Sequence, residues 1–317
     1  IWIHRPTKSF LAGALPKHPN QEPRVINRLG FSICILQSLA FAAPDISTVK
    51  PDLVLPVLSD AKPLAGLRVK QVLPGWQDSK VYHVLYLPPN WTPTGKLPVI
   101  IEFAGNGPYR NRFGDVSTGH PERSKMGYGI SGGKGFIWVC LPYLNNAGTA
   151  NVTKWWGNAP TYKAGPTVDY CKKAVPWICE KYGGDSNRVI LCGFSRGAIA
   201  CNFIGLHDDE IAKLWRAIIP YSHYDGVNER WGYPGADRKS AFVRLQRLGN
   251  RPQFICQESA TGRTNLNATQ KYLEDTGIKG RFTSQSTGFR NHNDAWLLRP
   301  SPARLALRKW VEKSLDN

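Results

Sequence analysis

The sequence predicts an α/β protein with a doubly wound, mostly parallel sheet. Short apolar runs alternate along the chain with segments of helical periodicity. Two of these runs, residues 97–105 and 135–143, are almost continuously apolar, as parallel strands buried on both faces are. The chain has 317 residues, of which 42% are hydrophobic and 20% charged, and this balance suits one large globular domain.

Each predicted element follows from its own pattern. Strands are predicted at residues 66–73, 80–88, 97–105, 135–143, 188–194, 216–224, 251–257 and 280–286. The first two alternate polar and apolar residues, which predicts half-exposed, antiparallel strands. Helices are predicted at about residues 167–182, from Arg196 onward, and at 208–215, 240–248, 265–273 and 302–313. Pro176 should kink the first of them and Gly183 should end it.

The N-terminal part predicts export. Residues 24–43 read RVINRLGFSICILQSLAFAA, which joins a basic flank, a short apolar run and a small-residue cleavage site ending near Ala42. A buried core helix is the alternative. We therefore expect an N-terminal extension and signal peptide in residues 1–42, a Pro-rich arm in 43–65, and a catalytic domain in 66–317. The expected location is secreted or periplasmic.

Charge and cysteine content limit the function classes. The chain carries a formal charge of +18, and residues 43–317 keep 36 basic against 22 acidic residues. Such a charge attracts polyanions, so an acidic polysaccharide is a candidate partner beside the simpler interpretation of a basic surface. No specific nucleic-acid motif, metal-ligand spacing or apolar run of about 18 residues for a membrane span is present. The oligomeric state is not predicted.

The run RVILCGFSRGAI (188–199) places Ser195 between two glycines, after an apolar strand and before a helical pattern. A serine hydroxyl must be held where a base reaches it, and a sharp strand–turn–helix does this. Gly193 and Gly197 leave room for such a turn because they lack a Cβ. The sequence therefore predicts that Ser195 is a nucleophile. An ordinary turn residue is the alternative.

A serine nucleophile needs a base and an acid. His292 lies between the last predicted strand and the last helix, at the edge of the sheet to which the serine points, and is the predicted base. His223, after an earlier strand, is its rival. Glu258 and Asp225 each follow a predicted strand, and either carboxylate could orient the imidazole.

Two further sets of residues are candidates for the site. An oxyanion hole needs two N–H donors, and the backbone of Arg196 together with the turn at Gly105 and Asn106 could supply them. An ordinary glycine turn is the alternative. Trp155 and Trp156 follow a strand end and could stack on substrate rings, or anchor their loop.

These residues resemble the α/β-hydrolase superfamily. The run YCKKAVPWICEKYGGDSNRVILCGFSRGA looks like that of secreted polyhydroxybutyrate-depolymerase-like and feruloyl- or acetylxylan-type esterases. The resemblance covers the order of elements over residues 66–313 and implies a Ser-His-acid hydrolase without a cofactor. It departs from the family pattern in two ways: QESATGRTN stands where an Asp signature is usual, and Ala198 replaces a second glycine.

The leading hypothesis is a secreted serine esterase acting on polysaccharide-linked esters or polyesters. Only some 26 residues separate the predicted strands 216–224 and 251–257, which leaves no room for a large lid domain and suits a bulky ester. A serine peptidase of the prolyl-oligopeptidase type is the first alternative, although no propeller domain precedes the elbow. A non-catalytic binding protein on the same fold is the second.

Overall fold

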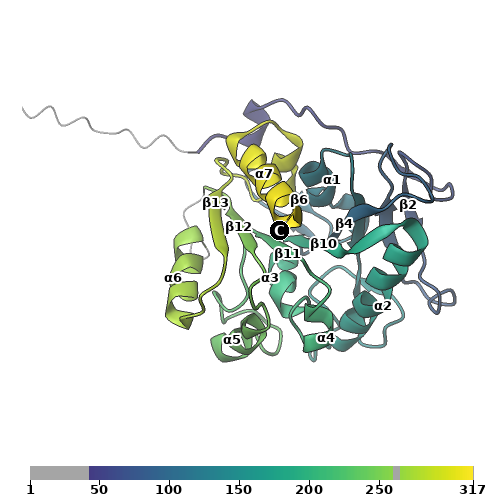
Figure 1. The fold of residues 1–317 in the computed structure, drawn as a ribbon. Coiled ribbons are helices and arrows are strands. Elements are labelled where there is room, and N and C mark those ends of the chain that lie inside the picture. The colour runs from purple at the N-terminus through teal and green to yellow at the C-terminus, as the bar shows by residue number, and fades with distance from the viewer. Residues whose placement is uncertain (1–42, 260–264, 317) are drawn as a thin grey trace, which may run out of the picture. The chain divides into compact units, whose positions relative to one another are not determined.

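A nine-stranded sheet forms the centre of the protein (Figure 1). The structure, a computed structural model, describes residues 43–259 and 265–316. The strands of the sheet are β1 (Leu58–Ser59), β2 (Arg68–Gln71), β3 (His83–Tyr86), β4 (Leu97–Phe103), β7 (Ile137–Leu141), β10 (Gly184–Phe194), β11 (Ala217–Tyr221), β12 (Gln253–Gln257) and β13 (Phe282–Ser286). Their spatial order is β1-β2-β3-β7-β4-β10-β11-β12-β13.

Strand β3 runs antiparallel to its neighbours β2 and β7. All other neighbouring strands of this sheet are parallel. Seven helices of the described residues accompany the sheet: α1 (Met126–Ser131), α2 (Gly165–Tyr182), α3 (Arg196–Phe203), α4 (Asp209–Ala212), α5 (Arg238–Gln246), α6 (Leu266–Thr276) and α7 (Pro302–Asp316). Two small hairpins pair β5 (Tyr109–Arg110) with β6 (Val116–Ser117) and β8 (Tyr143–Leu144) with β9 (Asn151–Val152). The predicted α/β class and its mostly parallel sheet are confirmed.

Successive residues of the central strands enter two different cores. In β10, Val189 and Leu191 pack in one core, whereas Ile190 and Cys192 pack in the other. Helices α2 to α6 contribute buried side chains to the first core, and α1 and α7 contribute to the second. The period of two along each strand thus explains why these runs are apolar throughout: both faces are covered.

The predicted strands and helices are present with shifted ends, and two details differ. β3 is buried at all four residues rather than half exposed, because it lies inside the sheet between β2 and β7. Helix α2 continues through Pro176 and ends at Gly183, whose left-handed backbone (φ 71°) closes it as expected. The connection from β11 to β12 contains one helix, α5, and no lid domain.

Helix α1 was not predicted, because its glycines argue against a helix. They are required by close packing: a Cβ on Gly127 would overlap the indole of Trp138, and one on Gly129 would overlap Leu297. The start of α1 points at the fully buried Glu102 of β4. The carboxylate of Glu102 accepts hydrogen bonds from the backbone of Met126 (3.2 Å) and Gly127 (2.9 Å) and from the Trp138 indole (2.8 Å).

Residues of the N-terminal arm also pack on this body. The 3₁₀ turn η1 (Ile46–Thr48) buries Ile46 in the second core. Arg304 of α7 donates two hydrogen bonds to Asp52, both 2.6 Å long. The six cysteines of the described residues are buried free thiols. Among the described residues, no helix is long and apolar enough to cross a membrane.

Glu102 should make folding depend on pH. Burial raises its pKa from 4.5 to about 7, so between these values the folded protein holds a proton that the unfolded chain releases. The protonated Glu102 thereby contributes on the order of 3 kcal/mol to the free energy of unfolding. This contribution is fully present below pH 4.5 and is lost as pH rises through 7. We expect Glu102→Gln to remove this dependence, measured as urea unfolding free energy at several pH values.

The comparison of the variant with the wild type is the informative quantity. Burial lowers the pKa of His83 to about 3 and that of His223 to about 4, and both effects favour folding as pH rises. These contributions cancel in the difference between the two proteins. Glu180→Gln, at an exposed position of α2, is the matched control. A constant difference between wild type and Glu102→Gln from pH 4.5 to 7.5 would contradict the assignment.

Candidate active site

Ser195 occupies a sharp turn between β10 and α3. Its backbone has φ 55° and ψ −112°, a region that residues with a Cβ rarely adopt, and its N–H donates to the carbonyl of Tyr221 in β11 (2.9 Å). The side chain is 8% exposed. The turn thus lifts the hydroxyl out of the sheet edge while the strand and the helix on either side remain regular.

The two flanking glycines permit this turn sterically. A Cβ on Gly193 would collide with the carbonyl group of Gly197, and one on Gly197 would collide with the carbonyl oxygen of Phe103 at the end of β4. Backbone atoms cannot yield as a flexible side chain can. The sequence pattern therefore reflects a close approach of three backbone segments around Ser195.

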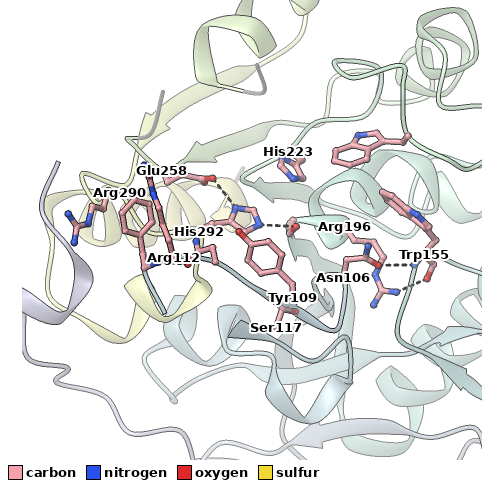
Figure 2. Close-up of a pocket in the computed structure, with 14 residues that line it drawn as sticks. Asn106, Tyr109, Arg112, Ser117, Trp155, Arg196, His223, Glu258, Arg290 and His292 are labelled. Carbon is pink, nitrogen blue, oxygen red and sulfur yellow. Dashed lines mark hydrogen bonds and ion pairs between the residues drawn. The ribbon is translucent and has the colours of Figure 1, made fainter. Parts of the chain in front are cut away.

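Ser195, His292 and Glu258 form a chain of hydrogen bonds (Figure 2). The Nε2 atom of His292 lies 3.0 Å from the Ser195 hydroxyl oxygen, and its Nδ1 atom lies 2.9 Å from Oε1 of Glu258. Ser195 follows β10, Glu258 follows β12, and His292 lies in the loop after β13. All three come from the carboxyl ends of parallel strands, which meet at one edge of the sheet.

Ser222, directly after β11, also contacts this chain. Its hydroxyl oxygen lies 2.7 Å from Nδ1 of His292 and donates to Oε1 of Glu258 at 3.1 Å. Ser222 is fully buried and has a positive φ of 88°, so its backbone is held in an unfavourable conformation. This hydroxyl fixes the carboxylate and the imidazole relative to each other.

Asp225 and His223 do not join the chain. Both carboxylate oxygens of Asp225 accept from Arg244 (2.8 and 3.0 Å), and the pair is buried. The structure thus gives this carboxylate a structural partner rather than an imidazole. The ring of His223 lies 5.3 Å from that of His292, and burial, followed by the His292 charge, lowers its pKa to about 4, which leaves it neutral at neutral pH.

The loop that carries His292 is held by a carboxylate that the sequence analysis missed. Asp115, 1% exposed, accepts hydrogen bonds from the backbone N–H of His292 (3.0 Å) and from the side chains of Asn111 (2.8 Å), Asn291 (3.0 Å) and Asn293 (3.1 Å). Four donors satisfy both oxygens. Asp115 therefore ties the connection between β5 and β6 to the loop after β13.

Arg196 acts through its side chain as well as its backbone. The buried guanidinium donates to the carbonyls of Trp155 (2.6 Å), Gly105 (2.8 Å) and Gly119 (3.1 Å) and lies 3.8 Å above the ring of Tyr143. Burial lowers its pKa to about 10, so it stays charged at neutral pH. One side chain thereby joins three loops around Ser195.

The residues predicted for the oxyanion hole, Arg196, Asn106 and Gly105, differ in their surroundings. Arg196 is the first residue of α3, so its N–H has no partner within the helix. Asn106 lines the cavity, and its side-chain oxygen accepts from the backbone of Trp155 (2.9 Å). Gly105 does not line that cavity; its carbonyl is held by Arg196.

A cavity of about 650 Å³ opens over Ser195. Aromatic side chains form much of its wall: Tyr109, Phe113, Trp155 and Trp231. Trp156, in contrast, is fully buried, stacked 4.3 Å from Phe203 in ring-centroid distance. The expectation of an exposed ring is therefore wrong for Trp156, because its ring packs among those of Tyr143, Phe203 and Tyr233.

Comparisons with known proteins give similarity in structure alone. No protein-family model matches the chain, and no curated protein matches it in sequence. A dipeptidyl peptidase 4 from Porphyromonas gingivalis has a TM-score of 0.51 at 17% identity, over 80% of this chain and 36% of that one. A thermostable esterase has a TM-score of 0.48 at 15% identity, over 78% of this chain and 62% of that one. An esterase from Thermogutta terrifontis with bound butyrate has a TM-score of 0.46 at 16% identity, over 78% and 91%.

The chain has the α/β-hydrolase fold. Its nine-stranded, mostly parallel sheet with helices on both faces and the structural likeness to the dipeptidyl peptidase support this. This chain spans less than two thirds of that peptidase and of the thermostable esterase.

Several residues of this site gave no signal in the sequence. Asp115, Arg112 and Phe113 lie in a polar stretch without periodicity, far in sequence from the histidine loop. Ser222 had one available signal, since it follows directly on a strand adjacent to that of Ser195. Strand ends are where α/β folds gather such side chains.

Replacing Asp115 should destabilise the protein strongly. In an asparagine, one of the two carboxylate oxygens becomes an NH₂ group, which would face N–H donors and could not accept their hydrogen bonds. We therefore expect Asp115→Asn to lower the free energy of unfolding by about 3 kcal/mol. Urea unfolding measures this. The matched control is Asp60→Asn, which changes charge equally at an exposed position and should cost less than about 0.5 kcal/mol. Equal losses in both variants would contradict the role given to Asp115.

Proposed function

We propose that the protein is a serine hydrolase that cleaves carboxylic esters, with Ser195 as nucleophile, His292 as base and Glu258 as the orienting acid. One observation carries the proposal: the continuous hydrogen-bonded chain from Ser195 through His292 to Glu258, which opens into a cavity. A serine that served only as a turn residue would not need an imidazole 3.0 Å from its hydroxyl.

The chemistry follows from this chain. Nε2 of His292 takes the hydroxyl proton as Ser195 Oγ attacks the ester carbonyl, and the resulting oxyanion is stabilised by the N–H groups of Arg196 and Asn106. His292 then donates the proton to the leaving alcohol oxygen, which leaves an acyl-serine. Water, deprotonated by His292, attacks this acyl-enzyme, and the acid departs as the proton returns to Ser195.

Glu258 stabilises the imidazolium that forms in each step and fixes the tautomer with a proton on Nδ1. Ser222 donates to the same carboxylate oxygen. Oε2 of Glu258 has no hydrogen-bond partner among the described residues. This leaves the charge of the acid directed at His292.

A bulky ester fits the cavity best. The proposed substrates are polysaccharide-linked esters or polyesters, as in polyhydroxybutyrate-depolymerase-like and feruloyl- or acetylxylan-type esterases. Trp155 and Trp231, whose ring centroids are 5.2 Å apart, offer a surface for a ring or an aromatic acyl group. The absence of a large insertion between β11 and β12 supports access for a polymer, and no cofactor is invoked.

The proposed setting is secreted or periplasmic, with a signal peptide in residues 1–42, an arm in 43–65 and the catalytic domain in 66–317. Residues 1–42 lie outside the described part of the chain, so this rests on the sequence pattern. The basic character of residues 43–317 supports attraction to acidic polysaccharides.

A serine peptidase is the second candidate, since one similar structure, with a TM-score of 0.51, is a dipeptidyl peptidase. A peptide N-terminus carries an ammonium group that needs an acidic partner. Glu258 is the one carboxylate among the described residues that line the cavity, and it is already bound to His292. This charge balance favours ester cleavage over cleavage near a free N-terminus.

Ser195→Ala should abolish ester turnover, by about 10⁴-fold or more, while folding survives. Turnover of para-nitrophenyl acetate and the urea midpoint measure the two effects. A fluorophosphonate should modify the wild type on Ser195, located by mass spectrometry of the peptide. A folded wild-type sample that gives neither turnover nor adduct would refute the proposal in favour of a binding protein.

The two rival acids should behave differently on substitution. Glu258→Gln leaves His292 without its charge partner and should lower kcat by about 10³-fold with a modest effect on stability. Asp225→Asn leaves Arg244 buried without a counter-charge and should cost about 3 kcal/mol in unfolding free energy, with kcat per folded molecule retained. A larger loss of kcat in Asp225→Asn would reassign the acid.

A further inference from the structure

The β5–β6 hairpin forms one wall of the catalytic cavity. Tyr109, Arg112 and Phe113 of this hairpin line the cavity, and the ring of Tyr109 lies 5.3 Å from that of His292. Asp115 fastens the hairpin to the histidine loop through hydrogen bonds to both. The side chains of the hairpin therefore have a defined position relative to the reacting groups.

Two guanidinium groups flank Phe113. The Cζ atoms of Arg112 and Arg290 lie 4.8 and 4.7 Å from its ring centroid, and both arginines line the cavity. Contact with an aromatic ring orients a guanidinium while its N–H groups remain available for hydrogen bonds. This arrangement places two guanidinium groups at one end of the cavity.

The charges of this end are incompletely balanced. Arg290 donates to Asp45 (3.1 and 3.2 Å), whereas Arg112 has neither an ion pair nor a hydrogen bond to any residue that the structure describes. Glu258, whose Oε1 binds His292 and Ser222, is the only carboxylate among the described lining residues, and Arg196 adds a third positive charge. The described lining residues thus carry three guanidinium groups and one carboxylate, and Arg112 is the guanidinium among them without a hydrogen-bonded or ion-paired partner in the described part of the chain.

The position of Arg112 relative to the Ser195–His292 pair indicates which half of a bound ester would lie beside it. Figure 2 shows Arg112 and Arg290 on the Glu258 side of His292, with Asn106, Arg196 and Trp155 on the opposite side. In the proposed reaction the oxyanion points to Asn106 and Arg196, and the leaving oxygen must approach Nε2 of His292 to receive a proton. The alcohol half of the substrate thus lies on the side of Arg112.

We propose that the enzyme selects esters whose alcohol half carries a carboxylate, bound by Arg112 with help from Arg290. This inference rests on the proposed esterase function and adds a substrate class to it. A guanidinium binds a carboxylate through two parallel N–H···O bonds, a geometry that a neutral hydroxyl cannot match. The acyl half lies against Trp155 and Trp231 and needs no charge.

A set of matched esters tests this. In the first pair, para-acetoxybenzoate and its methyl ester share the acetyl group and differ by the charge on the alcohol half. In the second pair, the hemisuccinate and butyrate esters of methyl para-hydroxybenzoate share the alcohol half and differ by a charge on the acyl half. We expect kcat/KM for para-acetoxybenzoate to exceed that of its methyl ester. Arg112→Met should lower this ratio about tenfold, and added salt should lower it in the wild type.

Arg110→Met is the matched control, because Arg110 lies in the same hairpin, is exposed and does not line the catalytic cavity. It removes the same charge and should leave the ratio within about twofold. Three outcomes would overturn the inference and leave the esterase proposal intact. The kcat/KM ratio of para-acetoxybenzoate to its methyl ester could be equal in the wild type and Arg112→Met, or it could fall equally in Arg112→Met and Arg110→Met. The third is a higher kcat/KM for the hemisuccinate than for the butyrate. Absence of turnover together with absence of a fluorophosphonate adduct would overturn both.

Discussion

The strained backbone at Ser195 is the constraint on which the rest of the site depends. A serine at φ 55° is unfavourable, and it persists because β4, β10 and α3 approach each other too closely for any side chain at Gly193 or Gly197. The same turn directs the start of α3 and the Ser195 hydroxyl to the edge of the sheet where β11, β12 and β13 end. Every other functional side chain is positioned relative to that point.

Two buried charges then hold the loops around the turn. Asp115 accepts four hydrogen bonds and joins the β5–β6 hairpin to the histidine loop, and Arg196 donates three and joins the loops at Gly105, Gly119 and Trp155. Hydrogen bonds offset the cost of burying a charge, so each of these residues favours the arrangement of neighbours that supplies its partners. Loops without regular structure gain a defined geometry in this way.

The same hairpin links the scaffold to the cavity wall. Its anchor, Asp115, is buried, while Arg112 and Phe113 of the hairpin face the cavity. Elsewhere the cavity is lined by the neutral imidazole of His223, the rings of Trp155 and Trp231, and the charged Arg196. An esterase built this way would distinguish the two halves of its substrate by charge, with catalysis at the boundary between them.

Local periodicity and glycine spacing report directly on strand, helix and turn, so the sequence predicted most of the sheet strands and helices and the sharp turn at Ser195. The sequence also predicted His292 and Glu258 as partners of Ser195, and their catalytic roles remain predictions. The tertiary structure decided what depends on partners distant in the chain. Glu258 and Asp225 both follow strands, and their contacts separate them: Glu258 binds His292, whereas Asp225 binds Arg244. Likewise Trp156 is buried, α1 forms despite its glycines, and Asp115 reaches a loop 177 residues away. Such contacts arise from packing, which no local pattern encodes.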